Sequence, residues 1–315
     1  MTRKGFTAPL FHNETAARDW FEASRWPNGP ICPKCKSAKF YATKKEGRYR
    51  CASPTCRKDF TVMTSTVMER SHAKFTDWAV AFHLAASSKK GFSAHQLHRE
   101  LGCQYNTAWF MFHRVREAMR HGGLELPPLG GEGLIVEADE TYFGKQENPQ
   151  LPAYRKEQPY KRKGRGRGRG PAGKRAVIAL VERGGEVRSF HPAIADGMTV
   201  NAIVRKNIAR ETRLLTDESK YYTNVGKEFS AHETVAHSRG EYVRGDVHTN
   251  TIEGFFSIFK RGMRGIYQHC KEKHLHRYLA EFDFRYNTRK LTDMERTVLA
   301  VRGGEGKRLT YHQPN

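Results

Sequence analysis

The 315-residue sequence lacks any apolar stretch near the roughly 20 residues that a membrane-spanning helix needs. Its N-terminus also lacks the apolar core of a signal peptide. These absences argue against a membrane partner and predict a cytoplasmic protein. Cysteine is scarce too, with six in the chain. In a reducing compartment, so few cysteines favour metal binding over a disulfide scaffold.

Acidic and hydrophobic residues are also in short supply. There are 33 acidic residues against 55 Lys and Arg, which gives a formal net charge of +22 and a pI near 9.9. Such an excess favours a polyanionic partner, and nucleic acid is the usual one. Hydrophobic residues make up 38% of the chain, which predicts a modest core carrying polar arms. The length allows two or three domains.

Four of the cysteines form a spaced set. The pattern is C-x2-C, fifteen residues, then C-x4-C, and its members are Cys32, Cys35, Cys51 and Cys56. Between the pairs, residues 39–50 alternate aromatic and basic side chains around Gly47, which predicts a β-hairpin. Thiolate pairs closed by a hairpin suit tetrahedral Zn²⁺ in a structural site. We therefore predict a zinc ribbon over residues 31–70, after an N-terminal helical segment over residues 1–30.

Residues 71–123 carry helical periodicity. The second of three predicted helices begins at Ser93 and ends at Gly102, and the third begins near Asn106. A short helix, a glycine turn and a longer basic helix resemble a helix-turn-helix, whose second helix enters the DNA major groove. A plain three-helix packing unit is the alternative. The residues that we expect to contact DNA surround the start of the third helix: Gln104, Tyr105, Asn106 and Thr107.

Beyond a Gly- and Pro-rich segment, residues 122–133, which we predict to be a linker, the pattern changes to strands. Residues 145–175 interrupt it, with no apolar periodicity and a low-complexity run of alternating Gly and basic residues. Because this segment lies between two predicted strands, we interpret it as a loop that grips the DNA backbone, with an affinity that falls steeply with salt. Its candidate DNA-binding residues are Arg165, Arg167 and Arg169. A flexible tail is expected over 303–315.

Acidic residues stand at the ends of apolar runs in this second half. Asp139 and Asp217 each end a predicted buried strand, and Glu253 opens an amphipathic helix after a further 35 residues. Strand alternation places Glu137 on the side of Asp139 and Glu140 on the other side, so Glu137 is a rival ligand. Separated carboxylates of this kind hold the divalent metals, Mg²⁺ or Mn²⁺, that catalyse polynucleotidyl transfer.

The order of strands, helices and acids resembles the ribonuclease-H-like core of DDE transposases and retroviral integrases. With the zinc ribbon, the chain resembles bacterial insertion-sequence transposases of the ISXO-like type, over roughly residues 10–290. The motifs that carry the resemblance are Glu137-Ala138-Asp139-Glu140-Thr141-Tyr142-Phe143-Gly144, Thr216-Asp217, and residues 248–261, which read HTNTIEGFFSIFKR. The implied fold is multidomain: a zinc ribbon, an all-α helix-turn-helix, and an α/β catalytic domain with a mixed sheet over 132–290.

The resemblance assigns Asp139 and Asp217 as the first two metal-binding acids. The family writes the third position as Glu or Asn followed by Lys, and this chain offers both Glu253 and Asn250, with Lys260 two helical turns on from Glu253. We favour Glu253, since a carboxylate holds a divalent metal better than an amide. A capping pair formed by Asn250 and Glu253 is the structural alternative. Lys260 is expected to contact phosphate.

The resemblance implies a DNA transposase that binds the terminal inverted repeats of an insertion sequence and cuts and joins DNA without a covalent protein intermediate. Such an enzyme works on double-stranded DNA, at the bacterial nucleoid, as a homo-oligomer that brings two ends together. The alternatives are a domesticated ribonuclease-H-like nuclease and a non-catalytic zinc-ribbon regulator. A tyrosine recombinase must also be weighed, because Tyr142, Tyr221 and Tyr222 lie near the acids in sequence.

Overall fold

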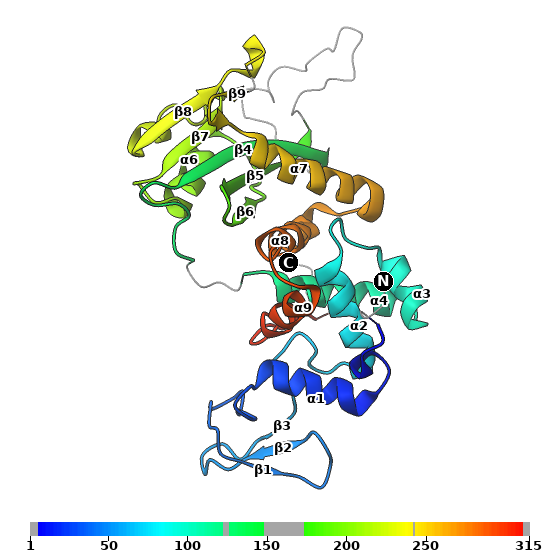
Figure 1. Ribbon diagram of the computed structural model, residues 1–315. Helices are drawn as coiled ribbons and strands as arrows, with labels where there is room; N and C mark the ends of the chain where they lie inside the picture. Colours follow the sequence, from blue (N-terminus) through cyan, green and yellow to red (C-terminus); the bar gives the residue numbers. More distant parts are fainter. Residues whose placement is uncertain (1–5, 122–125, 148–172, 242, 311–315) are drawn as a thin grey trace, which may run out of the picture. The chain divides into compact units, whose positions relative to one another are not determined.

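The computed structural model describes residues 6–121, 126–147, 173–241 and 243–310. The chain divides into two compact units, which are described separately. Unit 1 combines Met1–Leu124 with Ala280–Asn315, and unit 2 is Glu125–Leu279. The fold class expected from the sequence is confirmed, with a four-cysteine ribbon, a set of helices and a mixed sheet (Figure 1).

Unit 1 begins with a short helical turn, η1 (Pro9–Phe11), and the helix α1 (Glu14–Arg25). The side chain of Asn13 caps α1 by accepting a hydrogen bond from the backbone N–H of Ala16 at 3.0 Å. The helix ends two residues before Pro27, as the sequence predicts. Its apolar face is buried in unit 1 through Phe21, which is fully enclosed.

A small three-stranded antiparallel sheet follows. Its strands are β1 (Phe40–Ala42), β2 (Tyr49–Cys51) and β3 (Asp59–Phe60), in the order β1-β2-β3. The predicted hairpin is confirmed by the pairing of β1 with β2, and Gly47 in its turn has a φ of 69°. The third strand has two residues and no sequence pattern that predicts it.

The helical part of unit 1 contains α2 (Phe75–Ser87), α3 (Ala94–Leu101), α4 (Tyr105–Met119) and α9 (Asp293–Arg302). The apolar helix α2 packs against α1, α4 and α9, and α3 packs against α4. Ser93 caps α3, and Gly102 ends it with a φ of 62°. These boundaries confirm the predicted helix, turn and longer helix.

The C-terminal residues of unit 1 correct one prediction. Residues 303–310 were assigned to a flexible tail, yet they pack on the helices because they carry apolar and hydrogen-bonding groups. The backbone of Glu305 pairs with that of Thr66 in an isolated antiparallel β-bridge, and Leu309 is 6% exposed. Lys307 donates to the backbone carbonyl of Glu117 at 3.1 Å. Residues 311–315 lie outside the described residues.

Unit 2 is built on a five-stranded mixed sheet in the order β6-β5-β4-β7-β8. The pairs β4–β5 and β5–β6 are antiparallel, and the pairs β4–β7 and β7–β8 are parallel. The strands are β4 (Ile135–Lys145), β5 (Lys174–Glu182), β6 (Val187–Phe190), β7 (Arg213–Asp217) and β8 (Ala231–Val235). All except β8 are predicted by apolar runs in the sequence.

Helices cover both faces of this sheet. On one face, α6 (Gly197–Asn207) shares a core with alternate residues of the central strands, including Val136, Ala138 and Leu214. Against the other face, α7 (Asn250–Gly262) packs along β4 and β5 (Figure 1). The predicted linker is partly wrong, because Leu129 is 3% exposed and belongs to the α6 core.

The remaining elements are short, apart from α8. They are β9 (Val243–Arg244), β10 (Val247–His248), η2 (Val225–Glu228), η3 (His237–Arg239), η5 (Glu272–His274) and the π-helical turn η4 (Met263–Tyr267). The predicted last helix of the second half is confirmed as α8 (Leu275–Asn287), which runs from unit 2 into unit 1 at Ala280.

Candidate metal centres

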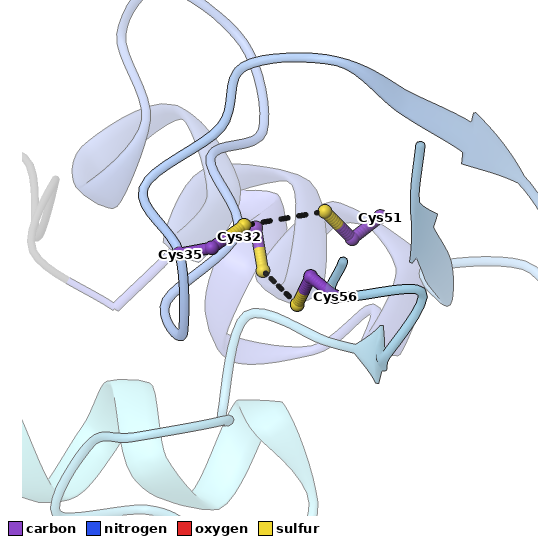
Figure 2. Close-up of side chains that lie close together, drawn as sticks. All are labelled: Cys32, Cys35, Cys51 and Cys56. Atoms are coloured by element: carbon purple, nitrogen blue, oxygen red, sulfur yellow. Dashed lines mark hydrogen bonds between the residues drawn. The ribbon is translucent and has the colours of Figure 1, made fainter. Parts of the chain in front are cut away.

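The four cysteines predicted to bind zinc come together in unit 1. Their sulfur atoms all lie within 4.8 Å of one another. The Sγ atoms of Cys32 and Cys56 are 3.8 Å apart, and those of Cys35 and Cys51 are 3.4 Å apart (Figure 2). Four thiolates at about 2.3 Å from a tetrahedral Zn²⁺ are about 3.8 Å apart. The set therefore fits a structural zinc ion.

Local hydrogen bonding prepares one of these thiols for metal binding. A backbone hydrogen bond from Ser37 and a side-chain hydrogen bond with Cys51 lower the pKa of Cys35 to about 7. The thiolate is the form that binds a metal. The two cysteines outside the set are Cys103 and Cys270, and neither joins a cluster within the described residues.

A second cluster consists of carboxylates in unit 2. One oxygen each from Asp139, Glu140 and Asp217 lies within 4.8 Å of the others. Asp139 and Glu140 come from β4, and Asp217 is the last residue of β7. The structure therefore brings together two acids that the sequence singled out and one, Glu140, that alternation placed on the opposite side of the sheet.

The end of a strand explains how Glu140 reaches this cluster. The parallel pairing of β4 with β7 stops at Ala138 and Thr216. Beyond that point no strand among the described residues pairs with β4 on this side, so carboxylates from both faces can meet at this edge. Glu140 is oriented from the α6 face by Tyr222, whose hydroxyl donates to it at 2.8 Å, and by Ser219. Strand alternation in the sequence predicts the direction of each Cα–Cβ bond, but it does not predict where the carboxylate at the end of a longer side chain lies.

Electrostatics in this cluster disfavour three charged carboxylates. Burial raises the pKa of Asp139 well above its ordinary value, and the nearby charges of Asp217 and Glu140 raise it further. Burial also raises the pKa of Asp217 and of Glu140. A divalent cation would offset both effects, since carboxylate oxygens are the ligands that Mg²⁺ and Mn²⁺ prefer. The residues present therefore fit such a cation.

Glu253 and Asn250 both lie in the first turn of α7, but their surroundings differ. The Glu253 carboxylate accepts a hydrogen bond from the Thr249 hydroxyl at 3.1 Å and lies 3.5 Å from Nε2 of His237. Its charge also contributes to the raised pKa of Asp139. Thr249, rather than Asn250, is the capping residue of α7. The alternative of a capping pair between Asn250 and Glu253 is therefore not observed, and Glu253 instead contacts Thr249.

Lys260 faces the same centre from two turns further along α7. It is partly buried, and burial lowers its pKa while the charge of Asp139 raises it. The charges of Arg264 and Lys174 lower the pKa of Lys260 further, so these two cations lie near Lys260. A partly desolvated lysine beside carboxylates is suited to contacting a phosphate group.

Glu137, the rival ligand, has a different position. It is fully buried, and its carboxylate accepts hydrogen bonds from Nε of Arg183 at 2.6 Å, from the Thr251 hydroxyl at 2.9 Å and from the backbone N–H of Ile252 at 3.0 Å. Thr251 and Ile252 belong to the first turn of α7, so Glu137 anchors the start of this helix to β4. Arg183 also donates to the backbone carbonyl of His248, which precedes α7.

The chain is similar to known transposase proteins over most of its length. A family model described as ISXO2-like transposase domain matches residues 128–287, about half of the chain. The chain belongs to this transposase family. A second model, described as transposase zinc-ribbon domain, matches residues 12–59. A Halobacterium salinarum protein described as "Uncharacterized protein in transposable element ISH50" is 29% identical over 286 residues, which cover 87% of this chain and 91% of that protein.

The transposase domain places the nearby tyrosines in supporting positions. Tyr222 is fully buried and donates to Glu140, and burial raises its pKa well above the ordinary value. Burial also raises the pKa of Tyr142 to about 12. Phenols held protonated in this way are poor nucleophiles, and this argues against a tyrosine recombinase.

The predicted DNA-binding residues of this transposase fall in two regions. Gln104, Tyr105, Asn106 and Thr107 surround the start of α4, and all four are exposed. Arg165, Arg167 and Arg169 lie outside the described residues. None of the helices in the described part of the chain has the length and apolar character needed to span a bilayer.

No sequence motif singles out Glu140, Arg183 or His237 as functional residues. For Glu140, its place directly after Asp139 is the only available signal. Arg183 lies in a turn and His237 begins the short helix η3. Neither has a motif of its own, and their roles follow from contacts with residues at the start of α7.

Proposed function

We propose that the protein is a DNA transposase that binds the terminal inverted repeats of an insertion sequence and catalyses metal-dependent cleavage and strand transfer. The observation that carries the proposal is the cluster of Asp139, Glu140 and Asp217 at the carboxyl end of β7, in a domain of a transposase family. The appended zinc ribbon and helix pair supply DNA-binding surface that a simple nuclease does not need.

In the first step, a water oxygen attacks the phosphorus at the element's end, and the bond from phosphorus to the 3′ oxygen breaks. In the second, the freed 3′-hydroxyl attacks a phosphodiester of the target, which releases a target 3′-hydroxyl. Divalent metal ions, when bound, stabilise the attacking and leaving oxygens of each in-line displacement. Both steps are in-line displacements at phosphorus in which a 3′ oxygen leaves, so a single site can catalyse both.

The chain's own residues hold and orient the reacting groups. Asp139, Asp217 and Glu253 are the proposed metal ligands, with Glu140 beside them. Lys260 is proposed to hold a non-bridging phosphate oxygen, because its ammonium group lies near Asp139 within a basic surrounding. Since two DNA ends must react together, we propose a homo-oligomer on DNA.

The test is Asp217→Ala, with Glu211→Gln as the matched control. Glu211 is an exposed acid of unit 2 outside the cluster. Using DNA that carries the element's ends, Asp217→Ala should lower cleavage and joining by at least about 100-fold, since a metal contributes several kcal/mol to such a transition state. DNA binding should persist in both variants. Undiminished metal-dependent joining by Asp217→Ala would overturn the proposal, and cleavage without joining by the unaltered protein would indicate a nuclease.

A further inference from the structure

Helix α4 carries a largely buried arginine, Arg114, that belongs to neither metal centre. Arg114 is 9% exposed, and within the described residues its guanidinium has no hydrogen-bond acceptor and no ion-pair partner. It lies over the ring of Phe110, 4.7 Å from the ring centroid. Its Nε atom is buried without an acceptor, and a buried donor left unsatisfied is costly, so an acceptor supplied from outside would be stabilising.

Other buried arginines of unit 1 are paired by the fold itself. Two positions along the same helix, Arg116 donates to the carboxylate of Glu281 at 2.7 Å. Arg25 donates to the backbone carbonyl of Val62 at 2.7 Å. Each of these two guanidinium groups therefore has at least one acceptor within the fold, although Nε of Arg25 has none, whereas no nitrogen of Arg114 has an acceptor among the described residues.

Arg114 lines a pocket with a volume of about 240 Å³. The other lining residues are Ser71, Trp78, Asn106, Thr107, Phe110 and Met111. None of them is acidic, and the polar ones can donate hydrogen bonds. The Ser71 oxygen already accepts from the indole N–H of Trp78 at 3.3 Å, so its own hydrogen is available to an acceptor.

The N-terminal end of α4, where the helix dipole is positive, also lines the pocket. Asn106 and Thr107 belong to the first turn of this 15-residue helix. Gln104 at the capping position makes no side-chain cap, and the first turn holds no acidic residue. Unpaired N–H groups and the helix dipole favour an anion at such an end. Burial lowers the pKa of Arg114 and the nearby Arg308 lowers it further, while the charge of Glu69 opposes both effects.

We propose that this pocket binds a phosphate group of the DNA backbone, with Arg114 as its main donor. The proposal rests on the proposed DNA-binding function and adds a residue to it. A guanidinium suits a phosphate because it can donate two parallel hydrogen bonds. A phosphate held here would fix the depth and direction of α4 in the groove, while the exposed side chains around its start contact the bases.

The test uses the full zinc-loaded protein and a duplex carrying the element's end. In this duplex the phosphates are replaced, one at a time, by uncharged methylphosphonates. We expect one linkage at which the replacement weakens binding by the unaltered protein about tenfold. Arg114→Met should bind normal DNA about tenfold more weakly than the unaltered protein does. The methylphosphonate at that one linkage should not weaken binding by this variant any further. Its salt slope should fall by about 0.9. In phosphate-free buffer it should melt no lower than the unaltered protein, because the unpaired buried charge is gone.

Arg99→Met is the matched control, since Arg99 is an exposed arginine of the neighbouring helix α3. This variant removes the same charge, but its affinity should still fall about tenfold when the phosphate at that one linkage is replaced. A second arm measures melting with inorganic phosphate against chloride at equal ionic strength. Stabilisation by phosphate that Arg114→Met abolishes, without coupling to any DNA linkage, would assign the pocket to free phosphate and overturn a DNA role.

Two further outcomes separate this proposal from the proposed function. If the unaltered protein binds the duplex and Arg114→Met binds it equally well, the pocket assignment is wrong and the transposase proposal stands. If Arg114→Met melts lower and loses affinity at every linkage alike, Arg114 is structural and the assignment is again wrong. Failure of the unaltered protein to bind any duplex would overturn both.

Discussion

Asp139 has the strongest electrostatic conflict among the proposed ligands. It is desolvated by burial and repelled by Asp217 and Glu140, so its folded-state pKa is well above the ordinary value of 3.8. Without a cation, the folded state therefore binds more protons than the unfolded state. Stability consequently falls as pH rises from 3.8 towards the raised pKa, and the loss is complete above it.

Asp139→Asn should remove this loss. In zinc-loaded protein free of Mg²⁺ and Mn²⁺, the variant should match the unaltered protein near pH 3.8 and melt increasingly higher as pH rises. Adding Mn²⁺ at pH 8 should raise the melting temperature of the unaltered protein and leave that of the variant unchanged. Thermal denaturation followed by circular dichroism over this pH range measures both effects.

Asp196→Asn provides the opposite sign as a control. Asp196 caps α6, and a backbone hydrogen bond from Thr199 lowers its pKa. Its contribution to stability is present above the ordinary pKa of 3.8 and lost as pH falls, so this variant should melt lower at neutral pH and match the unaltered protein in acid. Equal behaviour of the Asp139 and Asp196 variants would show that the Asp139 carboxylate carries no penalty.

The prediction that Glu253 rather than Asn250 is the third ligand rests on the same surroundings. Because the charge of Glu253 acts on Asp139, Glu253→Gln should reduce DNA cleavage by at least about 100-fold. Asn250→Ala, on the same helical turn, should cost less than about tenfold. Single-turnover cleavage in Mg²⁺ and Mn²⁺ measures both, and the reverse ranking would transfer the third ligand position to Asn250.

At this scale the sequence predicted much of the site from strand ends and helix starts. Asp139 and Asp217 both stand where apolar runs stop in the sequence, but only Asp217 ends its strand, whereas Asp139 lies within β4, which continues to Lys145. Glu140 was missed because the period of two describes backbone directions, whereas the meeting of carboxylates depends on where the neighbouring strand β7 ends.

Among the elements, α7 depends on a buried contact with the sheet. Glu137→Ala would leave Arg183 partly buried without its carboxylate and would free the first turn of α7. We expect a loss of about 2–3 kcal/mol in the free energy of unfolding, below the range for a fully buried pair because Arg183 is 19% exposed. Cleavage should fall as well, since Glu253 sits on that turn.

Urea denaturation and cleavage assays test the role of Glu137. Glu186→Ala is the control, since Glu186 is 53% exposed and only 3.9 Å from Arg188. If Glu137 were itself a metal ligand, Glu137→Gln would abolish Mn²⁺ binding while keeping stability. An anchoring role predicts that Glu137→Gln binds Mn²⁺ with a modest loss of affinity.

The ribbon is an element whose folding depends on its ion. Its three strands contain eight residues in all, too few to bury a core of their own. Cys51→Ser should lower the zinc content from one ion per chain to nearly none and expose the ribbon to trypsin at its many lysines. Cys103→Ser, outside the set, should keep the zinc. Zinc measured by atomic absorption, with a time course of proteolysis, checks both.

The strand β8 and the helix α9 were not predicted from the sequence. The strand β8 reads Ala-His-Glu-Thr-Val and buries only its last residue, Val235, completely. As the edge strand of the sheet it has few apolar neighbours, so neither alternation nor an apolar run marks it. The helix α9 was missed although Thr292 and Glu295 form a capping box.

For the whole molecule, a net charge of +22 sets how binding responds to salt. Part of this charge lies in the segment 161–169, where six of nine residues are Lys or Arg. Each phosphate neutralised by a basic residue contributes about 0.9 to the slope of log K against log salt concentration. The size of the slope therefore counts the backbone contacts that each part of the chain supplies.

Replacing all six basic residues of 161–169 by Ser should reduce the slope by up to about 5 and weaken binding to element ends and unrelated duplexes by the same factor. Sequence preference, measured as the ratio of the two affinities, should stay constant, because phosphate contacts carry no base information. Zinc content should not change. A selective loss on element ends would instead assign this segment to sequence recognition. An unchanged slope would mean that it does not contact DNA, and that the basic surfaces of the two units account for binding.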